Sequence, residues 1–386
     1  MISNVLFLGE FPSSELIKKS GGKIDSLYRD SQAIIEGLRK QENVRIDVIT
    51  IPDIAAFPQQ RLYLKSFYDN TDHIYSLPLL NLPFIKQLWI VFVLFIVGLK
   101  VVSRNKGVTY VICPYIVFHH ILAARLIKFF NRKHVKVLTV VPDIFFPKNT
   151  IKRWMNKYSE YLAKKSDSFV LYTKAMADYL GIVPQKFVII EGFYKIKDLK
   201  FTRHNPNVFT ITYTGTLNKK YGILRLLESM NYIPYKDIDL RLYGSGDAVD
   251  IIKEFSRKDY RIQYMGQVPK EEAVKALYSS SVLVNPRNSS DGEYVQFSFP
   301  SKDIEYMGTG VPAILCKLPS MPTEYFGYFL DAKDGSPLDI AQAIIKAYQM
   351  TKEERDNLGL QSKLFIEQRM NTVIQGREIL KLIMNQ

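Results

Sequence analysis

Apolar strand-like segments and amphipathic stretches alternate along most of the chain, and this alternation limits the possible folds more than any other feature. In the first half, helical stretches such as residues 25–39 and 117–130 separate segments rich in β-branched and aromatic residues at 5–8, 45–49, 110–112, 135–140 and 169–172. Alternation of this kind is typical of parallel sheets whose strands are joined by crossover helices.

A second series of the same kind follows residues 194–207, a polar, Lys-rich passage without periodicity that predicts an interdomain connection. Strands are expected at 209–213, 239–243, 262–264, 282–285 and 313–316, and helices at 223–230, 249–255, 270–279, 301–307 and from 352 onward. The sequence therefore predicts two tandem, doubly wound α/β domains of Rossmann type. Ligands are then expected at the carboxyl ends of the strands, in the cleft between the domains. The expected boundaries are 1–195, 196–365, and 366–386 for a terminal helix that returns to the first domain.

Composition excludes several other classes of protein. The 386 residues suffice for two cores, and 47% apolar with 23% charged residues excludes wholesale disorder. Two cysteines, Cys113 and Cys316, form neither a disulfide scaffold nor a metal-ligand spacing, which favours a reducing cytosol. No secretory signal is evident at the N-terminus. The apolar run 88–99 is shorter than the ~20 residues that span a bilayer, so a buried helix is favoured over an interfacial one.

Positive charge is concentrated in the first half of the chain. The net charge is +14, and residues 101–165 alone carry 13 Lys/Arg against 2 Asp/Glu. Such asymmetry indicates an anionic partner for one domain, such as a membrane surface, nucleic acid or a phosphorylated substrate, with a merely solvated basic face as the alternative. The basic stretch lacks interleaved aromatic platforms and matches no nucleic-acid module, so nucleic acid is not the expected partner.

Two glycine-containing loops follow expected strands of the second domain. In the first, Gly215 is followed by Lys219, Lys220 and Gly222, a pattern that suits phosphate because glycine permits close backbone approach and lysine supplies charge. A plain strand–helix turn would look similar. The second loop, 244–247, lacks the third glycine of a dinucleotide fingerprint. It predicts a turn that borders a nucleotide pocket, not an NAD site.

The segment 284–312 is the most informative one. Pro300 and Ser301 predict a helix start, at which the N–H groups of Ser301 and Lys302 would face an anion. Glu305 lies one turn later on the same face, where a carboxylate can accept hydrogen bonds from two adjacent sugar hydroxyls. The alternative is that Ser301 only caps the helix and Glu305 is a surface residue.

Four motifs in this order, YTGTLNKKYG, LYGSGD, YMGQVPKEEAVKALYSSSVLVNPR and SFPSKDIEYMGTGVPAI, resemble the retaining group-one glycosyltransferases of the GT-B fold. The similarity is greatest to their capsule and exopolysaccharide branch. The similarity is strong over about residues 205–330. In the N-terminal half only the general arrangement is similar.

The resemblance implies a donor site in the second domain. Lys220 or Lys219 would contact the diphosphate, Thr216 stands where many relatives have arginine, and Arg287 is the candidate to replace that cation. The family has a pair of glutamates in this segment. Phe297 stands at the position of the first, so Glu293 or Gln296 is the candidate to replace the missing acid. Glu305 stands at the position of the second and would hold the ribose. The complete set of expected donor-binding residues is Gly21, Gly22, Gly215, Thr216, Lys219, Lys220, Gly244, Ser245, Arg287, Ser298, Phe299, Pro300, Ser301, Lys302 and Glu305.

In the first domain the resemblance places Gly21 and Gly22 near the diphosphate and Asp143 toward the reacting sugar. The expected catalytic residues are Asp143, Lys220 and Arg287. The candidates for the acceptor or membrane side are Lys23, His119, Arg132, Lys133 and Lys136; for His119 and its neighbour His120, packing in the core is favoured over lining the cleft.

The expected function is transfer of a sugar from a nucleotide-sugar, with a UDP-sugar favoured, to a lipid-linked saccharide in capsule, exopolysaccharide or lipopolysaccharide synthesis. The enzyme would retain anomeric configuration, need neither metal nor cofactor, and lie in the cytoplasm on the inner face of the cell membrane. A nucleotide-sugar epimerase on the same fold and a non-enzymatic polybasic binding protein are the alternatives.

Overall fold

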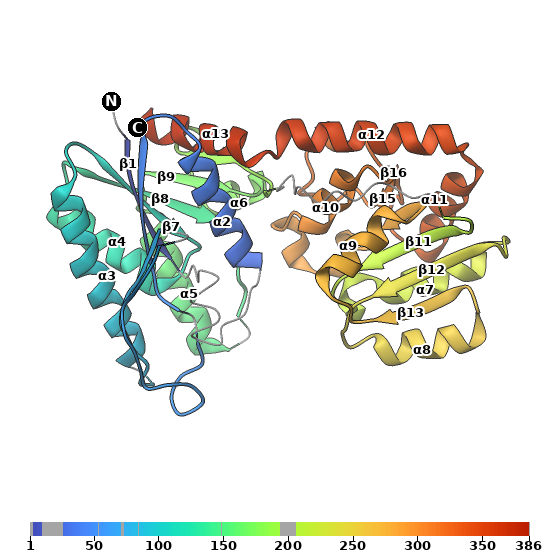
Figure 1. Cartoon of the computed structure of the whole chain (residues 1–386), viewed down its shortest axis with the longest axis horizontal. Coiled ribbons are helices and arrows are strands. Elements are labelled where there is room, and N and C mark those ends of the chain that lie inside the picture. The colour runs from blue at the N-terminus through green and yellow to red at the C-terminus, as the bar shows by residue number, and fades with distance from the viewer. Residues whose placement is uncertain are drawn as a thin grey trace. The chain divides into compact units, whose positions relative to one another are not determined.

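The chain folds into two α/β units, each built around its own sheet (Figure 1). The computed structural model describes residues 3–9, 26–52, 54–70, 73–83, 85–147, 149–193 and 206–385. Unit 1 comprises Met1–Phe193 together with Thr372–Gln386, and unit 2 comprises Tyr194–Asn371. The chain therefore returns to unit 1 at residue 372, not at the expected 366, because the helix that ends at Arg369 still belongs to unit 2.

Unit 1 contains a sheet of strand order β10-β9-β8-β7-β1-β2-β5-β4, in which, among the described strands, only the β4–β5 edge pair is antiparallel. Strands β1, β7 and β8 are buried along nearly their whole length, since helices cover both faces. The strands are β1 (Ser3–Gly9), β2 (Val44–Thr50), β4 (Phe67–Asp69), β5 (Ile74–Ser76), β7 (Thr109–Pro114), β8 (Val135–Val141), β9 (Ser168–Leu171) and β10 (Phe187–Ile189), with a separate ribbon of β3 (Tyr63–Leu64) and β6 (Leu79–Leu80).

The helices of unit 1 form two layers. One face of the sheet shares a hydrophobic core with α3 (Ile85–Arg104), α4 (Phe118–Phe130) and α5 (Thr150–Ala163). The remaining described helices of the unit are α2 (Ser26–Arg39), α6 (Lys174–Leu180) and α13 (Thr372–Met384). Of these, α13 packs along α2 and also contacts β9 and β10. Gly37 and Gly376 meet where α2 and α13 cross: a Cβ at Gly376 would lie 2.4 Å from the Gly37 carbonyl oxygen. This close approach holds the C-terminal helix on unit 1.

Helix α3 is longer than its apolar run of 12 residues predicts. It has 20 residues and is long and apolar enough to cross a membrane by length and composition alone, so the length argument against a spanning helix does not hold. Core helices of soluble proteins meet the same criterion. Here Ile90, Leu94 and Val102 are buried in the core that α3 shares with the sheet and α4.

Unit 2 contains a fully parallel sheet of order β13-β12-β11-β14-β15-β16. Its strands are β11 (Phe209–Thr214), β12 (Ile238–Tyr243), β13 (Ile262–Gly266), β14 (Val282–Val284), β15 (Ala313–Leu315) and β16 (Leu330–Asp331). Its helices are α7 (Ile223–Ser229), α8 (Val249–Lys258), α9 (Lys270–Tyr278), α10 (Ser301–Thr309), α11 (Pro337–Gln349) and α12 (Lys352–Arg369). Every strand expected from the sequence in either unit is present, with ends that agree to within two residues, and the expected α/β class is confirmed.

Candidate functional site

The two glycine loops of unit 2 touch through their backbones at the carboxyl edge of the sheet. The Gly215 N–H donates to the Tyr243 carbonyl at 2.8 Å, and the Leu217 N–H donates to the Ser245 carbonyl at 2.9 Å. Gly244 has φ +137°, and a Cβ there would lie 1.8 Å from the Gly215 oxygen. Only glycine fits at this contact, because any side chain would push the two loops apart.

Side-chain hydrogen bonds then join the two loops. The Asn218 Oδ1 atom accepts from the Asp247 N–H at 3.1 Å, and Asp247 Oδ1 accepts from the Lys219 N–H at 2.7 Å. This pairing fixes the start of the 3₁₀ turn η2 (Lys219–Tyr221), from which the exposed side chain of Lys220 extends with its Nζ 4.8 Å from the Tyr221 ring centroid. Lys219 and Lys220 are thus presented to solvent on a rigid turn.

A cavity of about 280 Å³ lies at the ends of β11, β12 and β13. Its volume is near the lower end of the range typical of ligand pockets. The lining combines hydroxyl and amide groups with small apolar side chains and comes from Thr214, Gly215, Thr216, Tyr243, Gly244, Ser245, Gln267, Val268 and Ala273. Thr214, Tyr243, Gln267, Val268 and Ala273 were not among the expected site residues, although all five lie within the four sequence motifs.

Helix α10 begins beside this cavity. Pro300 is its N-cap and makes no side-chain cap. The first N–H groups of any helix point away from its own carbonyls, so the start of α10 presents donors to this region. The Lys302 amine lies directly over Gly215, since a Cβ at Gly215 would lie 1.8 Å from it, and it is 5.4 Å from the Tyr213 ring centroid. The Phe299 side chain instead packs on Tyr325 in the core, so only its backbone borders the helix start.

A buried tyrosine holds α10 against the first strand. The Tyr306 hydroxyl accepts from the Thr214 N–H at 2.9 Å and lies 3.3 Å from the Thr214 carbonyl oxygen. Almost one turn earlier, the buried Asp303 carboxyl accepts from the Asn285 side-chain amide at 2.6 Å. These two contacts connect the end of β11, the end of β14 and the first turns of α10, so the helix start has a fixed position relative to both loops.

Arg287 follows β14 and has an unusual environment. Its guanidinium carbon lies 4.7 Å from the Tyr294 ring centroid, while its Nε and Nη2 atoms are buried and have no hydrogen-bond partner within the described residues. Leaving buried donors of a charged group unpaired costs about 1–3 kcal/mol or more. Burial raises the pKa of Tyr294, and the positive charges of Arg287 and Lys220 act to lower it, so both cations are close enough to Tyr294 to affect its ionisation. An anion at this position would satisfy the guanidinium.

The remaining unit 2 candidates lie around the start of α10. Glu305 is half-buried, and its carboxylate has no hydrogen-bond or ion-pair partner in the part of the chain that the structure describes. Phe297 is half-buried, and its N–H donates to the Tyr294 carbonyl at 3.1 Å. Glu293 and Gln296 are exposed on the short 3₁₀ turn before it, and Ser298 accepts through its carbonyl from Ser320 Oγ.

The buried Asp303 carboxyl makes stability depend on pH. Burial raises its pKa from 3.8 to about 7, against the opposing effects of Asn285, Arg287 and Lys302. The folded protein therefore binds a proton between about pH 4 and pH 7 that the unfolded chain releases, so the free energy of unfolding falls as pH rises through this window. We expect Asp303→Asn, which keeps an oxygen acceptor for Asn285, to be more stable than the wild type by a few kcal/mol at pH 8 and about equal to it near pH 4.

Urea denaturation of both proteins at several pH values measures this difference. Groups other than Asp303 cancel in the comparison, because both proteins contain them. A difference in unfolding free energy that does not change with pH would contradict the assignment.

The structure separates the unit 1 candidates. Asp143 is exposed just after β8, at the carboxyl edge of the sheet, and accepts from the Ile144 N–H at 2.9 Å. His119 is buried near the start of α4 with its ring 4.4 Å from that of His120, as the packing interpretation expects. Arg132, Lys133 and Lys136 lie before or early in β8, at the opposite edge of the sheet. Gly21, Gly22 and Lys23 lie outside the described residues.

The fold of the chain is shared with several solved structures. The chain is similar to Anabaena HepE solved with UDP, at 12% identity and a TM-score of 0.68 over 99% of this chain and 100% of that chain. It is also similar to sucrose-phosphate synthase from Thermosynechococcus elongatus, at 14% identity and a TM-score of 0.62 over 99% of both chains. A third similar structure is a variant of S. aureus TarM, at 14% identity and a TM-score of 0.55 over 83% of this chain and 61% of that one.

These similarities define the fold as GT-B, as the sequence predicts. Residues 208–350 match the family model described as "Glycosyl transferases group 1". The matched range contains both glycine loops, Arg287 and the start of α10, so the domain that the family model recognises is the one that carries the candidate site. A search of curated proteins found no match.

Proposed function

We propose that the protein transfers a sugar from a UDP-sugar, which binds at the carboxyl edge of the unit 2 sheet. The observation that carries the proposal is Arg287, whose buried Nε and Nη2 atoms have no partner among the described residues. Arg287 and Lys220 both act electrostatically on Tyr294, so their positive charges lie in the same region. Together with Lys302 over Gly215 and the first N–H groups of α10, these cations form a site for a diphosphate. HepE, a protein of the same fold, was solved with UDP and with UDP-glucose, which supports a uridine donor.

The neighbouring groups then have defined roles. The cavity beside Gly215 and Gly244 receives the nucleoside, and the half-buried Glu305 carboxylate accepts from the ribose hydroxyls. Departure of the nucleoside diphosphate places new negative charge where Arg287, Lys302 and Lys220 already supply positive charge. Because these donors are held in position before the reaction, they stabilise the leaving group more strongly than water does.

Retention of anomeric configuration, with a phosphate oxygen of the leaving group as the base, is part of the proposal and rests on the resemblance to the retaining enzymes. So does the acceptor, a lipid-linked saccharide of capsule, exopolysaccharide or lipopolysaccharide synthesis. Asp143, exposed at the carboxyl edge of unit 1, is the residue proposed to face the reacting sugar. The concentration of Lys and Arg in residues 101–165 supports a location on the cytoplasmic face of an anionic membrane.

We expect transfer from a labelled UDP-sugar to a lipid extract to continue in excess EDTA, because side-chain cations take the position that a metal ion would hold. Loss of transfer on chelation, restored by magnesium or manganese, would contradict metal independence. NMR of the anomeric proton of the product tests retention, and an inverted product would contradict it.

Binding of the donor is tested separately by thermal shift with UDP-, GDP- and dTDP-sugars. A ligand at about 100 times its dissociation constant stabilises the folded state by ~2.7 kcal/mol. If none of the three raises the melting temperature, the proposed nucleotide-sugar site is wrong. Isomerisation of the donor without transfer would instead identify an epimerase.

A further inference from the structure

Helix α5 of unit 1 turns its apolar face to solvent. Ile151, Trp154, Met155, Tyr158 and Tyr161 follow the three- and four-residue spacing of one helix face, a pattern that normally packs into a core. In α5 all five are exposed, with Ile151 at 71%, Trp154 at 69% and Tyr161 at 55%. The buried residues of the same helix are two polar ones, Ser159 and Glu160, and two apolar ones, Leu162 and Ala163. Among the described residues, nothing covers this apolar face.

The aromatic rings on this face pack against one another. The ring centroid of Tyr158 lies 5.9 Å from that of Trp154, and the two ring planes are 4° apart. The same centroid lies 6.3 Å from that of Tyr161 and 6.0 Å from that of Phe118 in α4. The rings therefore form an ordered aromatic surface, much of which is exposed to solvent. These rings lie between Lys and Arg residues of the stretch 101–165, so the expectation that this stretch lacks interleaved aromatic residues is wrong. Ile151 and Met155 on the same face offer no ring on which a base could stack, and they favour lipid over a single-stranded nucleic acid.

Positive charge borders the aromatic face. Lys152, Arg153 and Lys157 are exposed on α5, and Lys164 and Lys165 follow its C-terminal end. Between residues 143 and 165 the acidic residues are Asp143 and Glu160, and Glu160 is buried, where it accepts from the Asn156 side chain at 2.7 Å. Aromatic and aliphatic side chains with a Lys/Arg border are the pattern of a helix that lies in the interface of an anionic bilayer.

We propose that the α5 face, defined as Ile151, Trp154, Met155, Tyr158 and Tyr161, inserts into the headgroup region of an anionic membrane. The chain after β8 connects this face to Asp143 through Phe145 and Phe146, which are also exposed. Docking by α5 therefore brings the carboxyl edge of the unit 1 sheet toward the lipid. Arg132 and Lys133, which the sequence suggested for the membrane side, lie at the opposite edge of the sheet. The proposed membrane contact therefore differs from the one expected from charge alone. The link to a lipid-linked acceptor rests on the proposed function, whereas docking itself does not.

Trp154 is a built-in probe for this contact. The chain has two tryptophans, and Trp89 is half-buried with its indole N–H donating to the Pro78 carbonyl at 2.9 Å. In full-length Trp89→Phe, emission comes from Trp154 alone. With vesicles of phosphatidylcholine and phosphatidylglycerol, we expect this emission to shift to the blue and to be quenched by lipids brominated near the headgroup. Vesicles of phosphatidylcholine alone should give a much smaller effect.

Sedimentation with the anionic vesicles measures partition directly. We expect the double variant Ile151→Ser/Trp154→Ser to partition at least about tenfold less than the wild type, since it removes two of the exposed apolar side chains. The matched control is Leu360→Ser on α12 of unit 2, a leucine with 53% exposure, which should partition like the wild type. Because all of these positions are exposed, none of the changes should lower the melting temperature.

Three results would overturn the proposal: unchanged partition of the double variant, no emission shift of Trp154 on anionic vesicles, or a dimer in sedimentation velocity that the double variant dissociates. The last result would assign the face to a second copy of the chain. A thermal shift with a UDP-sugar, measured without lipid, tests the donor site independently. Loss of docking with retained donor binding contradicts only this inference, and the reverse result contradicts only the proposed function.

Discussion

Arg287→Ala should lower the rate of sugar transfer by about 10²–10³-fold, the usual effect of removing one donor that stabilises developing negative charge. The same change should leave the free energy of unfolding of the nucleotide-free protein unchanged or raised. These two effects follow from one observation: two guanidinium nitrogens are buried without a partner among the described residues, so without nucleotide the side chain carries a desolvation cost and no compensating hydrogen bond.

Arg355 offers a matched control in the same unit. Its guanidinium also stacks on an aromatic ring, 5.4 Å from the Phe209 centroid, but its Nη1 donates to the Ala347 and Met350 carbonyls. Arg355→Ala should therefore reduce stability and leave the turnover of folded molecules unchanged. If Arg287→Ala instead loses stability without nucleotide, or retains full transfer, Arg287 is a structural residue. Arg287→Lys should give an intermediate rate, since lysine keeps the charge but not the planar group.

Much of the unit 2 site could be predicted because its determinants are local in the sequence. Gly215 and Gly244 are each required by a turn that directly follows a strand, and Ser301 lies at a helix start marked by Pro300. Parallel strands bring such turns to one edge of a sheet, so their approximate position follows once the strands are recognised. The contact between the Gly215 and Gly244 backbones is an instance of this rule.

The parts that could not be predicted depend on what each side chain packs against. The ionisation of Asp303 depends on complete burial beside Asn285, and nothing in the segment 301–307 indicates burial. The cavity residues Gln267 and Val268 follow β13, but their position beside Gly244 requires the strand order. Helix α5 is the clearest case. Periodicity shows that it has an apolar face, and only the structure shows that this face is exposed.

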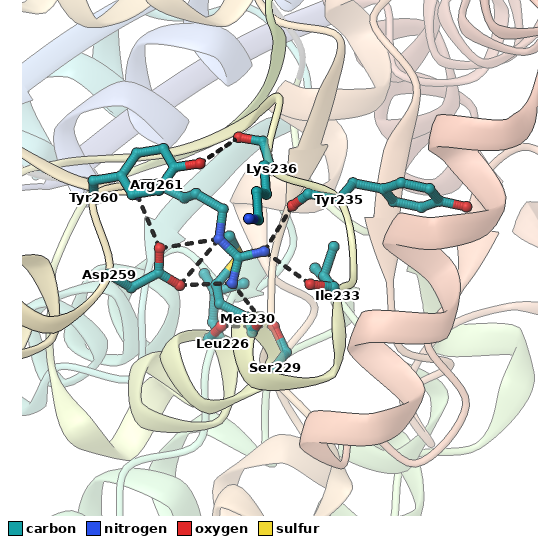
Figure 2. A network of polar contacts seen from close by, with 9 residues as sticks. All are labelled: Leu226, Ser229, Met230, Ile233, Tyr235, Lys236, Asp259, Tyr260 and Arg261. Atoms are coloured by element: carbon teal, nitrogen blue, oxygen red, sulfur yellow. Dashed lines mark hydrogen bonds and ion pairs between the residues drawn. The ribbon is translucent and has the colours of Figure 1, made fainter.

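One arginine in unit 2 illustrates a purely structural use of charge (Figure 2). Arg261 donates through Nη1 to the Ile233 and Tyr235 carbonyls, both at 2.8 Å, and through Nη2 to the Met230 carbonyl at 2.7 Å. It also bonds both carboxylate oxygens of Asp259, at 2.6 Å for the shortest contact. These bonds tie the chain that leaves α7 to the start of β13. Burial would raise the pKa of Asp259, but the Arg261 bonds outweigh it and lower that pKa.

We expect Arg261→Ala to reduce the free energy of unfolding by about 3–5 kcal/mol, because it leaves three carbonyls and a partly buried carboxylate without their donor. Arg261→Lys should recover little of this loss, since one ammonium cannot reach all four groups. Urea denaturation measures both effects.

The lowered pKa means that the stability contributed by the Asp259 carboxylate is present above its ordinary pKa and is lost as pH falls through its folded value. The free energies of unfolding of the wild type and Arg261→Ala should therefore converge in acid. Arg261 lies at the amino end of β13, whereas the cavity lies at its carboxyl end, so molecules of the variant that remain folded should transfer sugar at the wild-type rate. A variant as stable as the wild type would mean that water satisfies these carbonyls equally well.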